Sequence, residues 1–97
     1  MTNRFRLTLV QANPTVGAIA ANAARALEFW AQGRAAGAEM VALTEMFLTG
    51  YQTQDLVMKP AFAAHAMRAV EELAARITDG PALGIGGPCV KDGLLYN

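Results

Sequence analysis

The chain has 97 residues, a formal net charge of zero and one cysteine. These values exclude a basic surface for nucleic acid or an anionic membrane, a disulfide framework and a cysteine-rich metal site. No run of about 18 apolar residues is present to span a bilayer. The apolar run after the basic first residues is short and interrupted by polar residues, so it is not a signal peptide, and we expect a reducing, cytoplasmic location.

The composition also predicts that more protein covers this chain. Hydrophobic residues make up 54% of it and charged residues 16%, against roughly 25% charged in an ordinary soluble domain. A small domain has a large surface to cover, so it should be more polar than average. We therefore expect the chain to be part of a larger folded unit or a subunit of a homo-oligomer.

The first half of the chain predicts a strand, a helix and a second strand. Residues 5–11 begin with alternating side chains, which is typical of a strand with one strongly buried face. Residues 18–36 have apolar side chains at helical spacing, and Gly37 suits the C-cap. Residues 40–43 form a short apolar run, as expected of a strand covered on both faces. The buried stripe of the helix is predicted to be Ala20, Ala23, Ala24, Leu27, Trp30 and Ala31, opposite a polar side of Asn22, Arg25, Glu28 and Gln32.

The second half predicts a second helix and two further strands. Pro60 suits the first turn of a helix that runs to about residue 77. Residues 82–86 predict a third strand, residues 91–93 a hairpin turn, and residues 94–96 the start of a fourth strand. The order β-α-β-α-β-β implies an α/β fold in which right-handed crossovers join neighbouring parallel strands. The buried stripe of the second helix is predicted to be Phe62, Ala66, Ala69, Val70, Leu73 and Ile77.

Glu45 is the side chain that best fits a chemical role. It follows one short apolar run and lies inside another, where a charge is costly unless it is paired, hydrogen-bonded or protonated. A pKa raised toward the range of proton transfer is one consequence of such a setting. Its predicted position after the second strand also places it where functional groups gather in open α/β sheets. The alternative is a structural glutamate that caps a helix or pairs with an arginine.

The other reactive residue types have simpler interpretations. Nothing near Cys89 supplies the base that a nucleophilic thiol needs, so we expect a buried structural cysteine. His65 is the only histidine and cannot build a metal site alone, so no metal is expected. Lys59 is interpreted as a solvated loop charge. The glycines at 84, 86 and 87 lack the lysine and hydroxyl residue of a phosphate loop and favour close strand packing.

Three segments together resemble the nitrilase (carbon–nitrogen hydrolase) superfamily. They are residues 9–17, residues 43–51 (Leu-Thr-Glu-Met-Phe-Leu-Thr-Gly-Tyr) and residues 55–62 (Asp-Leu-Val-Met-Lys-Pro-Ala-Phe). The third segment is similar to the glutaminase domain of glutamine-dependent NAD synthetases, and residues 95–97 match the start of a family strand. The resemblance implies that residues 1–97 are the N-terminal part of a truncated glutaminase domain, within an α-β-β-α sandwich.

The resemblance also implies a Glu-Lys-Cys catalytic set in which Glu45 is the general base. Glu45 would take the proton of a cysteine thiol, and the thiolate would attack the side-chain amide of glutamine to form a thioester and release ammonia. The lysine would stabilise the oxyanion, and water activated by Glu45 would release glutamate. Tyr51 resembles a substrate-binding position. In an amidotransferase of this kind the ammonia would pass to a synthetase domain, where ATP and Mg are implied for converting deamido-NAD to NAD. No cofactor is expected in the present segment.

Two departures from the family pattern bear on activity. The family usually has proline before the glutamate, where this chain has Thr44. The family lysine and cysteine would lie beyond Asn97, because Lys59, Lys91 and Cys89 do not occupy matching positions. We therefore expect the full-length protein to be the enzyme and the 97-residue chain alone to be inactive.

Two other functions stay open at this stage. A free-standing amidase or carbamoylase of the same superfamily would stop after one sandwich, whereas an NAD synthetase carries a C-terminal domain with an ATP-pyrophosphate loop. The alternative of another class is a non-catalytic interaction fragment with an exposed apolar sheet. Size-exclusion chromatography tests it, because an exposed apolar surface favours assembly or aggregation.

Overall fold

A computed structural model describes residues 3–97, and these residues form one layer of helices on one layer of sheet. The predicted α/β class and the order β-α-β-α-β-β are confirmed, with one additional short strand before the hairpin turn and a 3-10 helix before the second α-helix. The elements are β1 (Leu7–Leu9), α1 (Ile19–Ala35), β2 (Met40–Ala42), η1 (Gln54–Met58), α2 (Pro60–Arg76), β3 (Ala82–Gly84), β4 (Cys89–Lys91) and β5 (Leu94–Tyr96).

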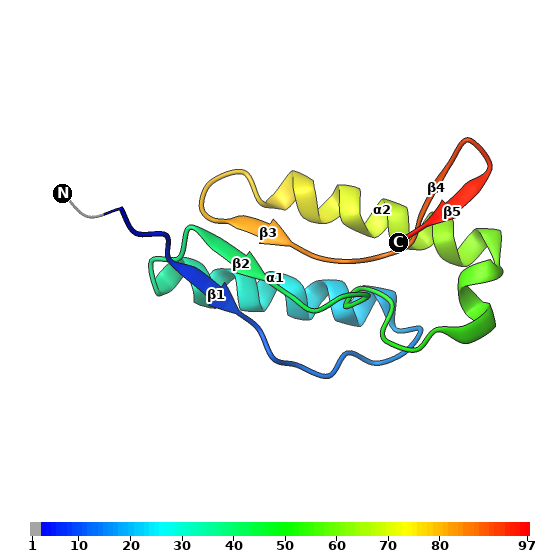
Figure 1. Ribbon diagram of the computed structural model, residues 1–97, viewed down its shortest axis with the longest axis horizontal. Coiled ribbons are helices and arrows are strands. Elements are labelled where there is room, and N and C mark those ends of the chain that lie inside the picture. The colour runs from blue at the N-terminus through cyan, green and yellow to red at the C-terminus, as the bar shows by residue number, and fades with distance from the viewer. Residues whose placement is uncertain (1–2) are drawn as a thin grey trace.

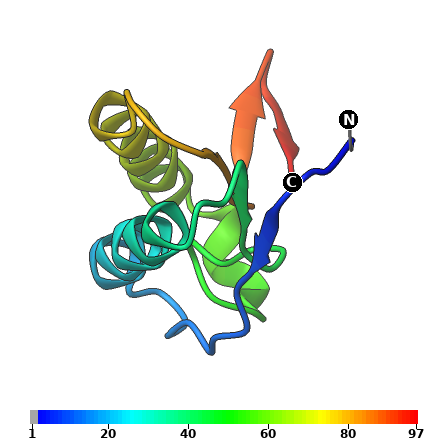
Figure 2. The ribbon, with the colours of Figure 1, turned by 90° about the vertical axis from the view of Figure 1, so that its left-hand side faces the viewer.

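Strands β1, β2 and β3 form a parallel sheet in sequence order (Figure 1). Leu7 pairs with Met40, and Met40 pairs with Ala82, so the three strands begin in register. Helices α1 and α2 provide the two crossovers and lie on the same side of the sheet (Figure 2). All three strands therefore end at one edge, and the loops that follow them can meet there.

Helix α1 has the predicted length but not the predicted buried face. Gly37 follows its C-terminus with a φ of +79°, as a C-cap glycine requires. The prediction that Asn22 lies on the polar side is wrong, because its side chain is buried and hydrogen-bonded to two loops. The predicted stripe is confirmed at Trp30 but wrong at Ala20, Ala24 and Ala31, which are exposed. It also misses three buried residues, Ile19, Ala26 and Gly33.

Helix α2 begins at Pro60, as predicted, and ends at Arg76. The proline ring fixes the backbone in a conformation that suits the first helical turn. Proline lacks a backbone N–H, but an N–H at this position would have no partner within the helix. The buried face is made of Ala63, Ala66, Ala69 and Leu73. The prediction that Val70 belongs to this stripe is wrong: Val70 is exposed, because it lies beside the buried face rather than on it.

The two faces of the parallel sheet differ in burial. Val41 in the central strand faces the helices and is fully buried against Trp30. Leu7 and Leu9 lie on the other face of β1, and Leu9 is 71% exposed. The expectation that this strand has one strongly buried face is wrong for residues 3–97, because β1 is an edge strand and no described segment covers the face opposite the helices. This exposed apolar face agrees with the low charge content of the chain.

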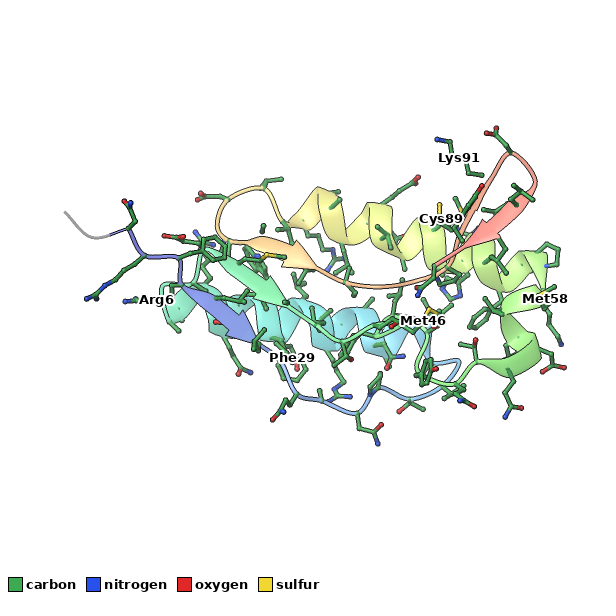
Figure 3. The ribbon with its side chains drawn as sticks, in the orientation of Figure 1. Arg6, Phe29, Met46, Met58, Cys89 and Lys91 are labelled. Carbon is green, nitrogen blue, oxygen red and sulfur yellow. The ribbon has the colours of Figure 1, made fainter. Side chains whose placement is uncertain are left out.

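The hairpin of β4 and β5 projects from the body of the molecule (Figure 1). Asp92 and Gly93 both have positive φ values, +52° and +76°, which is the pattern of a two-residue type I′ turn and confirms the predicted turn. Cys89 and Lys91 lie on this hairpin (Figure 3). The prediction of a buried Cys89 is wrong: its side chain is exposed, since both hairpin strands are exposed along their length.

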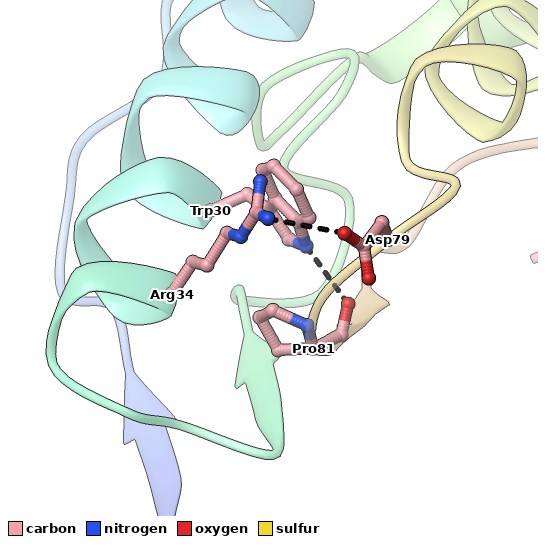
Figure 4. A network of polar contacts seen from close by, with 4 residues as sticks. All are labelled: Trp30, Arg34, Asp79 and Pro81. Carbon is pink, nitrogen blue, oxygen red and sulfur yellow. Dashed lines mark hydrogen bonds and ion pairs between the residues drawn. The ribbon is translucent and has the colours of Figure 1, made fainter.

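A polar network joins the end of α1 to the segment before β3 (Figure 4). The indole Nε1 of Trp30 donates a hydrogen bond of 2.8 Å to the carbonyl of Pro81. Arg34 lies over the Trp30 ring at 5.6 Å and pairs with Asp79 at 3.3 Å. The exposed ion pair is worth little by itself, but the buried indole bond ties α1 to β3.

Candidate active site

The candidate site lies at the edge of the sheet where the parallel strands end. Hydrogen bonds continue past the strands on both sides of β2, from Val10 N to Ala42 O at 2.9 Å and from Leu43 N to Gly84 O at 2.8 Å. The chain then leaves the sheet in a series of turns over residues 45–49. Glu45 is the first residue of these turns, as predicted from its place after the second strand.

The backbone on both sides of Glu45 is held by buried neighbours. Phe47 and Leu48 are fully buried and belong to two different clusters, each of which includes side chains of both helices. The carbonyl of Leu48 accepts a 3.0 Å hydrogen bond from the buried amide of Asn22, and the Leu48 N–H donates to Gly86 O at 3.3 Å. This loop, residues 43–50, is therefore fixed by the core although its first residues face solvent.

Close packing at Gly86 determines the backbone path of the loop at Glu45. A Cβ at Gly86 would lie 2.7 Å from the backbone nitrogen of Met46 and 3.3 Å from the Cα of Glu45. The predicted close packing of these glycines is thus observed against the Glu45 loop. Met46 has a φ of +56°, a conformation that a side-chain-bearing residue adopts at a cost and that is found at functional sites.

Thr44, in place of the family proline, is accommodated in this loop. The Phe47 N–H donates to the Thr44 carbonyl at 3.2 Å, which closes a turn around Glu45 and Met46. The turn therefore forms without a proline ring. Figure 3 shows Met46 past the carboxyl ends of β1 and β2.

The carboxylate of Glu45 is exposed in the described chain, which corrects the expectation that it is removed from water. The apolar residues after it, Met46, Phe47 and Leu48, are buried, whereas the glutamate side chain lies at the surface. Its Oε1 accepts a 2.7 Å hydrogen bond from Nδ2 of Asn97. The structural alternatives are not observed within residues 3–97, since Glu45 neither caps a helix nor pairs with an arginine.

A groove of about 300 Å³ contains this hydrogen bond. Glu45 and Tyr51, the two site residues proposed from the sequence, both line it. Tyr51 is 68% exposed, so its ring is available to a ligand. The sequence reasoning missed the contribution of the hairpin, which brings Leu95, Tyr96 and Asn97 to the same groove. The only available signal was that residues 95–97 match a family strand.

The remaining reactive side chains lie elsewhere. Lys59 precedes α2, and Lys91 and Cys89 are on β4; all three are exposed, and none of them lines the groove. His65 is exposed on α2, beside the separate groove between the two helices. The groove at Glu45 thus brings together a carboxylate, an amide and two phenols, but no nucleophile from the part of the chain that the structure describes.

The resemblance assigns ATP and Mg to a separate synthetase domain and not to the present segment. No group of three or more His, Cys, Asp or Glu side chains within residues 3–97 is placed to hold a metal ion. The glycines at 84 and 86 pack against the Met40 side chain and the Glu45 loop, so they do not cradle a phosphate. Within the same range, neither helix has the length and apolar character needed to cross a membrane.

Comparison with known proteins gives matches along the chain. The carbon–nitrogen hydrolase family model matches residues 6–97. The chain is 67% identical to the glutamine-dependent NAD(+) synthetase of Rhodobacter capsulatus and 36% identical to that of Xylella fastidiosa, with all of this chain and 18% of each relative covered. A crystal structure of a glutamine-dependent NAD(+) synthetase from Cytophaga hutchinsonii has a TM-score of 0.87 at 28% identity, over 96% of this chain and 16% of that one. The chain thus spans less than a fifth of these relatives, and the match confirms the predicted nitrilase-like fold.

Proposed function

The chain belongs to the carbon–nitrogen hydrolase family, and we propose that it supplies the general base, Glu45, of a glutamine-hydrolysing active site. The observation that carries the proposal is the position of the Glu45 carboxylate, exposed in a groove at the carboxyl edge of the parallel sheet. The loop that presents it is fixed by buried Phe47 and Leu48. A rigid backbone with a reachable carboxylate is what proton transfer at a fixed point requires.

In the proposed reaction, Glu45 takes the proton of a cysteine thiol that the rest of the protein provides. The thiolate attacks the side-chain amide carbon of glutamine, and a lysine stabilises the oxyanion. The C–N bond breaks as the departing nitrogen takes the proton from Glu45, which releases ammonia and leaves Glu45 ionised again. Water that loses its proton to Glu45 then cleaves the thioester to give glutamate and the free thiol. Tyr51 is proposed to bind the substrate, since its exposed ring lines the same groove.

We further propose that the ammonia serves an ATP- and Mg-dependent conversion of deamido-NAD to NAD in another domain of the complete protein. The 67% identity to a glutamine-dependent NAD(+) synthetase supports this function over a free-standing amidase. The chain contains one of the three proposed catalytic groups, so we expect residues 1–97 alone to be inactive.

The test compares Glu45→Gln with Glu39→Gln in the complete gene product, read through the coding sequence past Asn97. Glu39 is an exposed glutamate just before β2, at the other end of the strand, so its variant makes the same chemical change away from the groove. We expect Glu45→Gln to lose glutamine hydrolysis by about 10²–10⁴-fold, the contribution of general acid–base catalysis. NAD synthesis from free ammonia should persist in both variants. Unchanged glutamine turnover in Glu45→Gln would remove this carboxylate from the mechanism.

A further inference from the structure

We infer that Asn97 is a positioning residue for Glu45, holding the carboxylate in the orientation from which it accepts a proton. The inference rests on the proposed function of Glu45 as the base. Asn97 follows β5 directly, and its Nδ2 lies 2.7 Å from Oε1 of Glu45. The two residues are 52 positions apart in the sequence and meet in the groove that Tyr51 also lines.

The backbone and the side chain of Glu45 are held by different parts of the molecule. The backbone is fixed by the turn at Thr44 and by the contact with Gly86. These contacts leave the side-chain torsions free, and a glutamate that is free to rotate loses orientation entropy when it reaches the reacting group. Asn97 is the one hydrogen-bond partner of the carboxylate within residues 3–97.

The chemistry of the pair suits a base. An ionised carboxylate only accepts hydrogen bonds, so it must face the NH₂ side of the amide. The bond engages Oε1 and leaves Oε2 to receive the proton. An amide is also uncharged, so it orients the carboxylate without the strong stabilisation of negative charge that an arginine or lysine would bring.

The hairpin places Asn97 beside Glu45 in a groove that has no positively charged side chain among the described residues. Tyr51 and Tyr96 are the titratable side chains that line the groove with Glu45, and no lysine, arginine or histidine among the described residues lines it. Among the described residues, the contact therefore orients the carboxylate without a cationic side chain beside it.

The experiment uses the complete gene product with Asn97→Leu, which keeps the size of the side chain but removes its donor. We expect kcat for glutamine hydrolysis to fall about tenfold to a hundredfold with little change in KM, as for the loss of a hydrogen bond to a charged group. Ammonia-driven NAD synthesis should be unchanged. Asn3→Leu is the matched control, since Asn3 is exposed and does not line the groove.

Asn97→Asp tests the same contact by adding a negative charge next to Glu45. It places a second carboxylate beside Glu45, and like charges disfavour the ionised form. We expect the acid limb of the pH profile for glutamine kcat/KM to move to higher pH, whereas Asn3→Asp should leave the profile in place. A general structural defect would lower the amplitude without moving the limb.

The outcomes separate this inference from the proposed function. Wild-type kcat in Asn97→Leu, beside an inactive Glu45→Gln, would overturn the positioning role and leave the base in place. Glutamine hydrolysis that survives Glu45→Gln would overturn both. If Asn97→Leu loses both activities, the Asn97→Asp profile decides: a shifted acid limb supports the inference, and an unmoved one overturns it.

Discussion

The loop that carries Glu45 and the hairpin that carries Asn97 meet at one hydrogen bond but are built in opposite ways. Residues 46–50 of the loop are buried without interruption, whereas every residue of the hairpin from 89 to 97 is exposed. The loop is held by the core on both sides; the hairpin contacts α2 through a weak bond from Val90 N to the Met67 sulfur at 3.4 Å.

This difference separates two requirements of the candidate site. The loop determines where the carboxylate is anchored, because its backbone cannot move without disturbing buried side chains. The hairpin determines how the carboxylate is oriented, through a contact that can change without loss of the core. Substitutions in the loop should therefore cost stability, and substitutions in the hairpin should chiefly alter function.

Truncation of Phe47 should give the largest effect on stability. Phe47 is fully buried and makes an edge-to-face contact with Phe29 at 6.3 Å. We expect Phe47→Ala to lower the free energy of unfolding of the complete gene product by about 3–5 kcal/mol, because a cavity replaces the ring. Urea denaturation measures this value. Leu94→Ala in the hairpin is the matched apolar truncation and should cost less than about 1 kcal/mol; equal losses would contradict the comparison.

Removal of the Asn22 side chain should have the next largest effect. Its amide donates to the carbonyls of Thr15 and Leu48 and its oxygen accepts from the Thr15 N–H. Asn22→Ala leaves the buried Leu48 carbonyl without this donor, so we expect a loss of about 1–3 kcal/mol in the same urea measurement. Gln32→Ala, an exposed change on the same helix, should lie within about 0.5 kcal/mol of wild type. A similarly small loss in Asn22→Ala would show that this amide does not hold the loop.

A turn substitution in the hairpin should cost less. Gly93 has a φ of +76°, and a Cβ added there would have no neighbouring atom within 4 Å, so an alanine meets conformational strain but no clash. We expect Gly93→Ala to destabilise the protein by about 1 kcal/mol. Glutamine turnover should fall more than ammonia-driven synthesis, since the turn positions β5 and thus Asn97. An equal effect on the two activities would argue against a separate orienting role for the hairpin.

Replacement of Cys89 should have the smallest effect. The thiol is exposed on β4 and does not line the groove. We expect Cys89→Ser to keep glutamine hydrolysis within about twofold of wild type and to change stability by less than about 0.5 kcal/mol. A large loss of glutamine hydrolysis with wild-type stability would instead identify Cys89 as a participant in the reaction.

The sequence predicts the helices and turns better than it predicts which of their side chains are buried. Both helices and the turn at Asp92 and Gly93 follow from local signals, such as Pro60 at a first helical position. Burial depends on partners distant in the chain. Helical spacing places Asn22 on a polar face, but its partner Leu48 lies 26 residues away.

The same limit applies to the candidate site. Glu45 is identified from its place after a strand, and the structure confirms that place. Its exposure could not be predicted, because apolar neighbours in the sequence do not show which way a turn directs each side chain. Asn97 stands out in the sequence only as part of a segment that matches a family strand. Its contact with Glu45 depends on the path of α2 and the hairpin between them.

The hydrogen bond between Trp30 and Pro81 makes tryptophan fluorescence a probe of whether β3 has joined the sheet. The 97 residues contain one tryptophan, and its indole is buried against a carbonyl 51 residues away. The second crossover must be complete before this bond can form. Within this chain, a change in tryptophan emission during refolding should therefore mark the moment when β3 joins the sheet, ahead of or together with the hairpin that follows it.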